Sequence, residues 1–231
     1  MQTRLILLAR SAGLVALGCL AALGLVSCGT YSSDSSSAAN RGWRTLFDGT
    51  SKEGWEMAGP GELVLQDGEL ETRGGMGLLW YAQEKLGNCQ IRVVFKPTQK
   101  EDNSGVFIRI ADRPTDPWIG VNKGYEIQID NTGDEYHRTG CLYSLTQAKK
   151  AVDAKVGEWN TFLITLDGPH TIIQLNGWVI TDYTEGQPVP AKKVGYEPDR
   201  GLRPNLGYFG LQNHGDPARV RFKEVSVRSL R

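Results

Sequence analysis

The feature that most constrains the fold is a succession of short apolar runs, each closed by residues that favour turns. Asp67-Gly68 and Asn176-Gly177 have the composition of two-residue hairpin turns, because a type I′ turn needs positive φ at both central positions. Asp167-Gly168 is a third candidate. Long runs with helical periodicity are absent, so the pattern predicts many antiparallel strands joined by tight turns.

About eleven strands are predicted from the alternation of apolar and polar residues, and this number in a chain of 231 residues indicates a large all-β sandwich or barrel. Residues 188–204 carry no strand pattern and are predicted to form a long surface loop, a kind of segment that often carries function. The predicted strands span Glu62–Gln66, Glu69–Thr72, Gly77–Trp80, Cys89–Lys96, Ser104–Ile110, Tyr125–Asp130, Thr161–Asp167, His170–Leu175, Trp178–Tyr183, Tyr208–Gln212 and Arg219–Ser229.

The N-terminal residues 1–27 have the features of a lipoprotein signal peptide. Arg4 and Arg10 precede an apolar run over residues 11–26, which leads into a Leu-Val-Ser-Cys sequence ending at Cys28. This sequence is typical of a bacterial lipoprotein box, in which the cysteine is lipidated and becomes the first residue of the mature protein. The alternatives are an ordinary signal peptide and an uncleaved membrane anchor.

Residues 28–41 then comprise the lipidated cysteine and a Ser-rich segment. Such a segment has too little apolar surface to fold, so we expect a flexible tether. Residues 42–231 form the predicted domain. A lipid anchor would hold the protein on a membrane, which predicts a place in the bacterial cell envelope, on the periplasmic or the outer-surface side.

The composition excludes two broad classes of protein. The 26 Lys+Arg are balanced by 26 Asp+Glu, so the chain lacks the basic excess that drives nucleic-acid binding. With 40% hydrophobic and 23% charged residues, disorder of the whole chain is excluded as well. Within the domain, Cys89 and Cys141 could form a disulfide in an oxidising compartment or remain two buried thiols.

Three of the predicted strands carry polar side chains along one face, at a spacing of two residues. We expect these faces to converge on one concave pocket, where glycines among them would let a ligand approach the backbone. The three stripes are Asn103, Gly105, Phe107 and Arg109; Glu126, Gln128 and Asp130; and Gly210, Gln212 and His214.

Seven short motifs follow one another along the domain. They are Trp43 to Gly49 with Gly54-Trp55, Asn103 to Arg109, Tyr125 to Asp130, Thr139 to Tyr143, Glu158-Trp159-Asn160, Leu175-Asn176-Gly177 and Gly210 to Gly215. This order resembles the 3-keto-disaccharide hydrolase family, formerly the domain of unknown function numbered 1080, from Trp43 to about Val227. The resemblance implies a concanavalin-like jelly-roll sandwich of two antiparallel sheets in an envelope or secreted protein.

The resemblance also implies a reaction on 3-keto-glucosides. A ketone at C3 acidifies the C2 proton, and loss of that proton allows β-elimination of the C1 substituent. Water then adds to the resulting glycal, which gives net hydrolysis. Such a site needs a base that titrates near neutrality, an electrophile for the enolate oxygen and an acid for the leaving group.

Four residues are expected to be catalytic. His214 is the predicted base, because histidine titrates near neutrality. Arg109, paired with Glu126, would anchor the enolate oxygen or a sugar hydroxyl, unless this pair is purely architectural. Tyr143 would donate a proton to the leaving oxygen or pack against a sugar ring.

A second group is expected to bind substrate: Asn103, Gln128, Asp130, Gln212, His137 and Trp118. Their amide groups suit sugar hydroxyls, and an indole can stack on a sugar ring. His137 and Trp118 lie in predicted loops, where a surface histidine and a loop-anchoring aromatic residue are the alternatives. Glu126, Asp130 and His214 could hold a divalent metal, although no metal-binding sequence motif supports one.

Other functions stay open on the same fold. A non-catalytic carbohydrate-binding domain and a surface-anchored interaction protein are the alternatives to a keto-sugar enzyme. An ordinary glycosidase is disfavoured, because Glu126 and Asp130 lie about 13 Å apart along one strand, whereas a glycosidase needs two closer carboxylates. The expected partners are a keto-sugar or oligosaccharide and, through the lipid anchor, a membrane.

Overall fold

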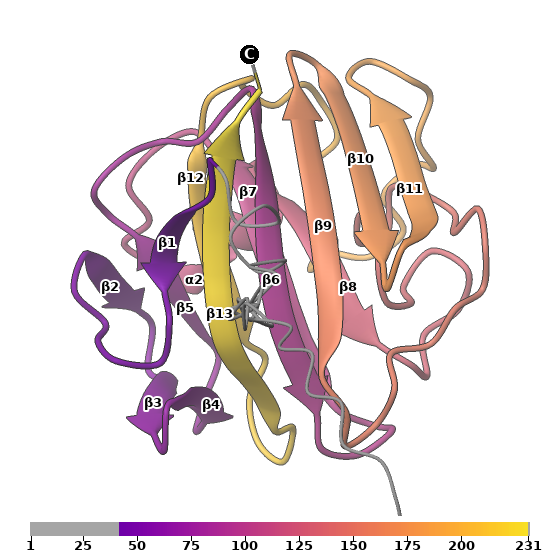
Figure 1. The fold of residues 1–231 in the computed structure, drawn as a ribbon. Helices are drawn as coiled ribbons and strands as arrows, with labels where there is room; N and C mark the ends of the chain where they lie inside the picture. The colour runs from indigo at the N-terminus through magenta and orange to yellow at the C-terminus, as the bar shows by residue number, and fades with distance from the viewer. Residues whose placement is uncertain (1–41, 231) are drawn as a thin grey trace, which may run out of the picture. The chain divides into compact units, whose positions relative to one another are not determined.

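The computed structural model describes residues 42–230, so the predicted signal peptide, the lipidation site at Cys28 and the tether lie outside the described residues. The described part is built from strands β1–β13 and one short helix, α2 (Figure 1). Their bounds are β1 Arg44–Phe47, β2 Trp55–Ala58, β3 Glu62–Gln66, β4 Glu69–Arg73, β5 Gly77–Tyr81, β6 Cys89–Pro97, β7 Asn103–Ile110, α2 Pro117–Lys123, β8 Tyr125–Asp130, β9 Asn160–Asp167, β10 His170–Leu175, β11 Trp178–Thr184, β12 Tyr208–Asn213 and β13 Val220–Ser229.

The strands form two antiparallel sheets packed face to face, which confirms the predicted all-β sandwich (Figure 1). The larger sheet has the order β11-β10-β9-β6-β13-β4-β3, and β1 pairs with β13 beside this path. The smaller sheet has the order β2-β5-β12-β7-β8. In the smaller sheet β7 and β12 are neighbours, although about a hundred residues separate them in the sequence. Polar stripes that are far apart along the chain therefore lie side by side.

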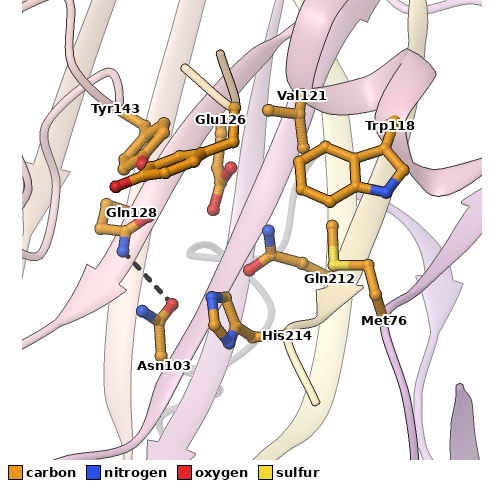
Figure 2. Close-up of a pocket in the computed structure, with 10 residues that line it drawn as sticks. Met76, Asn103, Trp118, Val121, Glu126, Gln128, Tyr143, Gln212 and His214 are labelled. Carbon is orange, nitrogen blue, oxygen red and sulfur yellow. Dashed lines mark hydrogen bonds between the residues drawn. The ribbon is translucent and has the colours of Figure 1, made fainter. Parts of the chain in front are cut away.

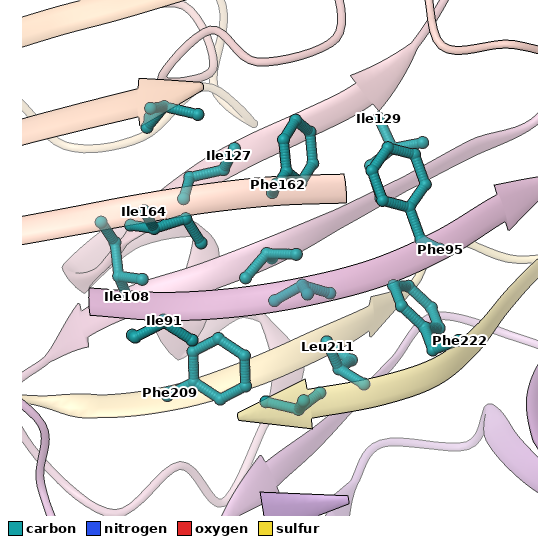
Figure 3. Packing of buried hydrophobic residues seen from close by; sticks show 14 of the residues in the cluster. Ile91, Phe95, Ile108, Ile127, Ile129, Phe162, Ile164, Phe209, Leu211 and Phe222 are labelled. Carbon is teal, nitrogen blue, oxygen red and sulfur yellow. The ribbon is translucent and has the colours of Figure 1, made fainter. Parts of the chain in front are cut away.

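The core lies between the two sheets and is made of the alternate, inward side chains of each strand (Figure 3). Phe95 of β6 and Phe162 of β9 stack with their ring centroids 4.6 Å apart. From the smaller sheet, Ile127 and Leu211 face them and are fully buried. Burial of one face of every strand fixes the register, since a slip by one residue would expose the whole apolar set.

A second, smaller apolar cluster covers part of the outer face of the smaller sheet. Helix α2 begins at an N-cap, Asp116, with a proline in its first turn, and it presses Val121 onto this face. Gly120 permits the close approach, because a Cβ there would lie 3.1 Å from the ring of Phe107. The helix therefore shields part of this face and leaves the rest to the polar stripes. No helix within residues 42–230 has the length and apolar character needed to cross a membrane.

Candidate functional site

A pocket of about 320 Å³ opens on the outer face of the smaller sheet, beside helix α2 (Figure 2). Figure 2 shows Trp118 on one side and Tyr143 on the other, with the side chains of Glu126, Gln212 and His214 between them. This main pocket is lined by Met76, Asn103, Trp118, Val121, Glu126, Gln128, Tyr143, Tyr196, Gln212 and His214. It thus brings together seven of the residues singled out from the sequence, contributed by all three polar stripes, by α2 and by the segment after β8.

A second depression of about 390 Å³ adjoins the first and shares Asn103, Gln128, Tyr143 and Tyr196 with it. We call it the side pocket. It contains the two remaining predicted binding residues, Asp130 and His137. Its other lining residues are Asp134, Lys193, Val194 and Glu197.

Glu126 forms the floor of the main pocket and is only 6% exposed. Its side chain lies over Gly105 of β7, where a Cβ would stand 2.7 Å from the Glu126 Oε1 atom. Burial raises the pKa of this carboxyl to about 8, and interaction with the Gln212 side chain opposes the rise. Glu126 is therefore mostly protonated at neutral pH and can donate a hydrogen bond, which an ordinary glutamate cannot.

His214 follows the last residue of β12 and lies at the mouth of the main pocket, partly open to solvent. Loss of hydration among the surrounding atoms lowers the pKa of its imidazole, and the carboxylate of Asp130 opposes this effect. The ring is therefore mainly neutral at pH 7 and can accept a proton. The pocket thus holds two titratable groups whose pKa values are displaced in opposite senses.

The chain before His214 is fixed by Asn213, a residue that the sequence analysis gave no role. The buried Asn213 side chain donates to the carbonyl oxygens of Glu62, Arg73 and Gly75, at 3.4 Å and 2.8 Å for Glu62 and Gly75 respectively. Its own oxygen accepts from the Gly215 backbone N–H at 3.2 Å. These bonds hold both sides of His214 and so fix the place from which its ring reaches the pocket.

Two buried amide side chains present oxygens with no hydrogen-bond partner. Gln128 and Gln212 are each 2% exposed, and the Oε1 atom of each lacks a donor. The Gln128 Nε2 group donates to Asn103 Oδ1 at 3.3 Å. Buried polar atoms are nearly always paired in proteins, so two orphan acceptors at one pocket indicate a place for donors from a bound molecule, such as sugar hydroxyls.

Aromatic side chains line the sides of the pocket. Trp118 lies in the first turn of α2 rather than in the predicted loop. Its backbone N–H donates to Asp116 Oδ1 at 2.8 Å, and the residue is 45% exposed. Tyr143 packs edge to face on His137, with ring centroids 5.1 Å apart. Desolvation raises the pKa of Tyr143 to about 12, so its hydroxyl stays protonated at neutral pH.

The predicted loop over residues 188–204 supplies Tyr196, which is 60% exposed and lines both pockets. Two arginines hold this loop through main-chain carbonyl groups. Arg200 donates to the carbonyl oxygens of Pro190 and Pro198 at 2.8 Å and 2.7 Å and to the Ser144 side chain at 3.1 Å. Arg203 is buried and bonds the carbonyl groups at the end of α2. Sequence analysis missed Tyr196, because no periodic pattern marks a loop residue.

Arg109 is not in the pocket, and the predicted Arg109–Glu126 pair is wrong. The register of β7 against β12 shifts near Arg109, whose φ is 58°, so the side chain turns to the opposite face of the sheet. Its guanidinium donates to Gly168 O at 2.8 Å and to Thr171 Oγ1 at 3.2 Å in the larger sheet. Strict alternation along β7 cannot anticipate such a bulge.

Asp130 borders the side pocket, and its carboxylate also caps its own turn by accepting from the Thr132 and Gly133 backbone N–H groups at 2.7 Å and 3.1 Å. One further expectation, on the glycines, needs correction. The glycines of the stripes make room for protein atoms rather than for a ligand. Gly105 accommodates Glu126, and a Cβ at Gly210 would lie 2.5 Å from Leu78.

Neither a disulfide nor a metal-binding cluster occurs among residues 42–230. Cys89 and Cys141 are separate buried thiols, and burial raises the pKa of each to about 11. In the described part of the chain, no three His, Cys, Asp or Glu side chains are grouped so as to hold a metal ion. Glu126, Asp130 and His214 are therefore not assembled as a ligand set.

Comparison with known proteins places this geometry in context. A family model described as a 3-keto-alpha-glucoside-1,2-lyase-like domain matches residues 42–228. Two Parabacteroides distasonis ATCC 8503 crystal structures, both of proteins provisionally assigned as glycosyl hydrolases, share the fold. One has 25% identity and a TM-score of 0.63 over 81% of this chain and 99% of its own. The other has 23% identity and a TM-score of 0.65 over 84% and 97%.

A more distant similarity concerns the fold alone. The carbohydrate binding module CBM66 from Bacillus subtilis has 14% identity and a TM-score of 0.53, over 76% of this chain and 96% of its own. No curated protein sequence matches the chain.

Proposed function

The chain belongs to the 3-keto-alpha-glucoside-1,2-lyase-like domain family, and from this premise we propose that it cleaves 3-keto-glucosides by proton abstraction at C2 and β-elimination at C1, followed by hydration. The observation that carries the proposal is the pairing, in one pocket, of a histidine whose pKa is lowered with a buried glutamic acid whose pKa is raised. Titratable groups displaced in opposite senses are typical of acid–base sites.

His214 is the proposed base. Its lowered pKa keeps the imidazole neutral at pH 7, so it can take the C2 proton of a sugar bound in the main pocket. A proton on C2 is acidic only when C3 is a ketone. The unoxidised glucoside is therefore not a substrate in this scheme.

Glu126 is the proposed electrophile, in place of Arg109. As a neutral carboxylic acid on the pocket floor, it can donate a hydrogen bond to the C3 carbonyl oxygen and stabilise the negative charge that develops there. A carboxyl with an ordinary pKa would be ionised and would repel the same oxygen. Burial against β7 is thus the property that suits Glu126 to this role.

The remaining lining residues suit sugar recognition. The orphan amide oxygens of Gln128 and Gln212 can accept from sugar hydroxyls, and Asn103 adds a further amide beside them. The exposed indole of Trp118 offers a flat apolar surface to one side of a ring.

The direct test is incubation of the protein with a 3-keto-glucoside in D₂O, with loss of the keto sugar and exchange at C2 followed by NMR. His214→Asn keeps polarity and approximate size but removes the base, and we expect a rate loss on the order of 10²-fold or more. The matching unoxidised glucoside is the substrate control and should not react. Full activity of folded His214→Asn protein would remove His214 from this role.

A second candidate function is carbohydrate binding without catalysis. It is favoured by the exposed aromatic residues Trp118 and Tyr196 beside two orphan amide acceptors, since such a surface can bind a sugar without reacting. Binding of both the keto and the unoxidised glucoside by calorimetry, with no exchange at C2, would support this candidate over the enzyme.

We also propose that the protein acts as a lipoprotein of the bacterial cell envelope. The support is the lipoprotein box that ends at Cys28, separated from the folded domain by the Ser-rich stretch before residue 42.

A further inference from the structure

The side pocket continues the main pocket along the sheet, and the two share Asn103, Gln128, Tyr143 and Tyr196. A molecule that fills the main pocket with one ring therefore has a second space for whatever is attached to that ring. The lining of this space is largely polar or charged, in contrast to the apolar contacts that Met76 and Val121 make in the main pocket.

One imidazole in the side pocket is held in a defined orientation. His137 Nδ1 lies 2.6 Å from Asp134 Oδ1, and the same carboxylate oxygen accepts the Tyr136 backbone N–H at 2.9 Å. The His137 backbone N–H in turn donates to Asp134 O at 3.0 Å. Asp134 is thus fixed by its own turn, and an ionised carboxylate facing Nδ1 places the hydrogen on Nδ1 and leaves Nε2 for another partner.

The surroundings of Asp134 keep its carboxyl ionised. Burial opposes ionisation of Asp134, but the hydrogen bond from the Tyr136 N–H, the contact with His137 and the charge of nearby Lys193 together lower the pKa of this carboxyl. The His137 ring packs edge to face with the ring of Tyr143, which lines both pockets. The imidazole therefore lies beside the boundary between the pockets, where the bond between the reacting sugar and its substituent would cross.

The geometry points to His137, oriented by Asp134, as the catalytic acid that protonates the departing C1 oxygen, with the side pocket as the subsite for a hydroxyl-rich leaving group. This inference rests on the proposed function. In the elimination, His214 takes the C2 proton, the C2–H electrons form the C1=C2 bond, and the C1–O bond breaks. Its electron pair stays on the leaving oxygen, which takes the Nε2 proton of the His137 imidazolium and leaves that ring neutral, with its hydrogen on Nδ1.

The hydration step restores both groups. Neutral His137 takes a proton from water, the hydroxyl adds to C1, and protonated His214 returns its proton to C2. The sum is hydrolysis, with no oxidant or reductant consumed. Tyr143 is a weaker candidate for the acid, because its raised pKa makes release of the phenolic proton costly at neutral pH.

The test compares leaving groups that differ in their need for a proton. For His137→Gln, cleavage of a 3-keto-glucoside with a methyl or sugar leaving group should fall on the order of 10²-fold. Cleavage of the 4-nitrophenyl 3-keto-glucoside should fall far less, because nitrophenoxide leaves without protonation. Exchange of the C2 proton with D₂O should persist, since His214 is untouched. Asp134→Asn, which keeps the imidazole, should show the same selectivity with a smaller loss.

The chain offers a matched control. His170 Nε2 lies 2.7 Å from Asp182 Oδ1, a second histidine–aspartate pair, on β10 and β11 of the larger sheet and outside both pockets. His170→Gln should leave both leaving-group rates unchanged. Equal losses for the methyl and nitrophenyl substrates in His137→Gln, or no loss in either, would overturn the assignment of His137. A wild-type protein that neither exchanges C2 nor cleaves any keto-glucoside would instead reject the proposed function on which this inference rests.

Discussion

The buried carboxyl of Glu126 makes the stability of the protein depend on pH, and Glu126→Gln isolates that dependence. The pKa of this group rises from an ordinary value of 4.5 to about 8 in the folded protein. Below both values the carboxyl is protonated whether the chain is folded or unfolded. Between them only the unfolded chain loses the proton, so the free energy of unfolding falls by about 1.4 kcal/mol per pH unit.

Summed over that interval, ionisation of Glu126 in the unfolded chain lowers the free energy of unfolding by about 5 kcal/mol. The full decrease is reached once the pH exceeds the folded pKa. Glutamine has the size of the protonated acid and stays neutral. The variant should therefore match the wild type at about pH 5 and exceed its stability by a difference approaching 5 kcal/mol at about pH 9.

Urea unfolding followed by tryptophan fluorescence at a series of pH values measures this difference directly. The lowered pKa of His214 contributes a trend of opposite sign, but it is common to both proteins and cancels in the comparison. Glu53→Gln, at an exposed carboxylate, is the control and should follow the wild type. Parallel stability curves for the wild type and Glu126→Gln would refute a raised pKa for Glu126, and with it the neutral acid on the pocket floor.

Three further predictions follow from other contacts. Gly105→Ala should displace the Glu126 carboxyl, because the new Cβ would stand 2.7 Å from Oε1. We expect the unfolding free energy to fall by about 1–3 kcal/mol, and not to fall when Glu126 is already replaced by alanine. Thermal unfolding of the four proteins of this double-mutant cycle measures the difference. Arg109→Met should lower the unfolding free energy by about 3 kcal/mol, because it leaves partly buried carbonyl groups unpaired. It should not change kcat per folded molecule, and a selective loss of kcat would return Arg109 to the active site. Cys28→Ser should release the folded protein from membranes in cell fractionation, whereas continued membrane association would indicate an uncleaved anchor.

The sequence predicted the strands well because each has one buried face, and such a face leaves a pattern of period two. It failed where that regularity stops. The bulge at Arg109 turns the side chain through the sheet, and alternation along β7 carries no sign of it. Strands β1 and β2 have four residues each, and α2 has seven, too few for a pattern to stand out from the flanking turns.

The candidate site was predicted in composition rather than in geometry. Period-two spacing placed Glu126, Gln128, Gln212 and His214 on polar faces, and the sheet order then brought those faces side by side. The burial that displaces the pKa of Glu126 depends on the neighbouring strand β7, where Gly105 lies under its side chain. Tyr196 comes from the loop over residues 188–204, whose path is set by tertiary contacts that no local pattern encodes.

The way this loop is fastened has a consequence for how the site could diversify. Arg200 and Arg203 bind mostly main-chain carbonyl groups, which every amino acid supplies, so the anchors impose little on the identity of the residues between them. Residues 192–196 can then vary while the base of the loop keeps its path. Substitutions at residues 192–196 would let related chains acquire new leaving-group preferences while the proton-transfer residues stay unchanged. The same segment is the one to exchange when the specificity of this scaffold is redesigned.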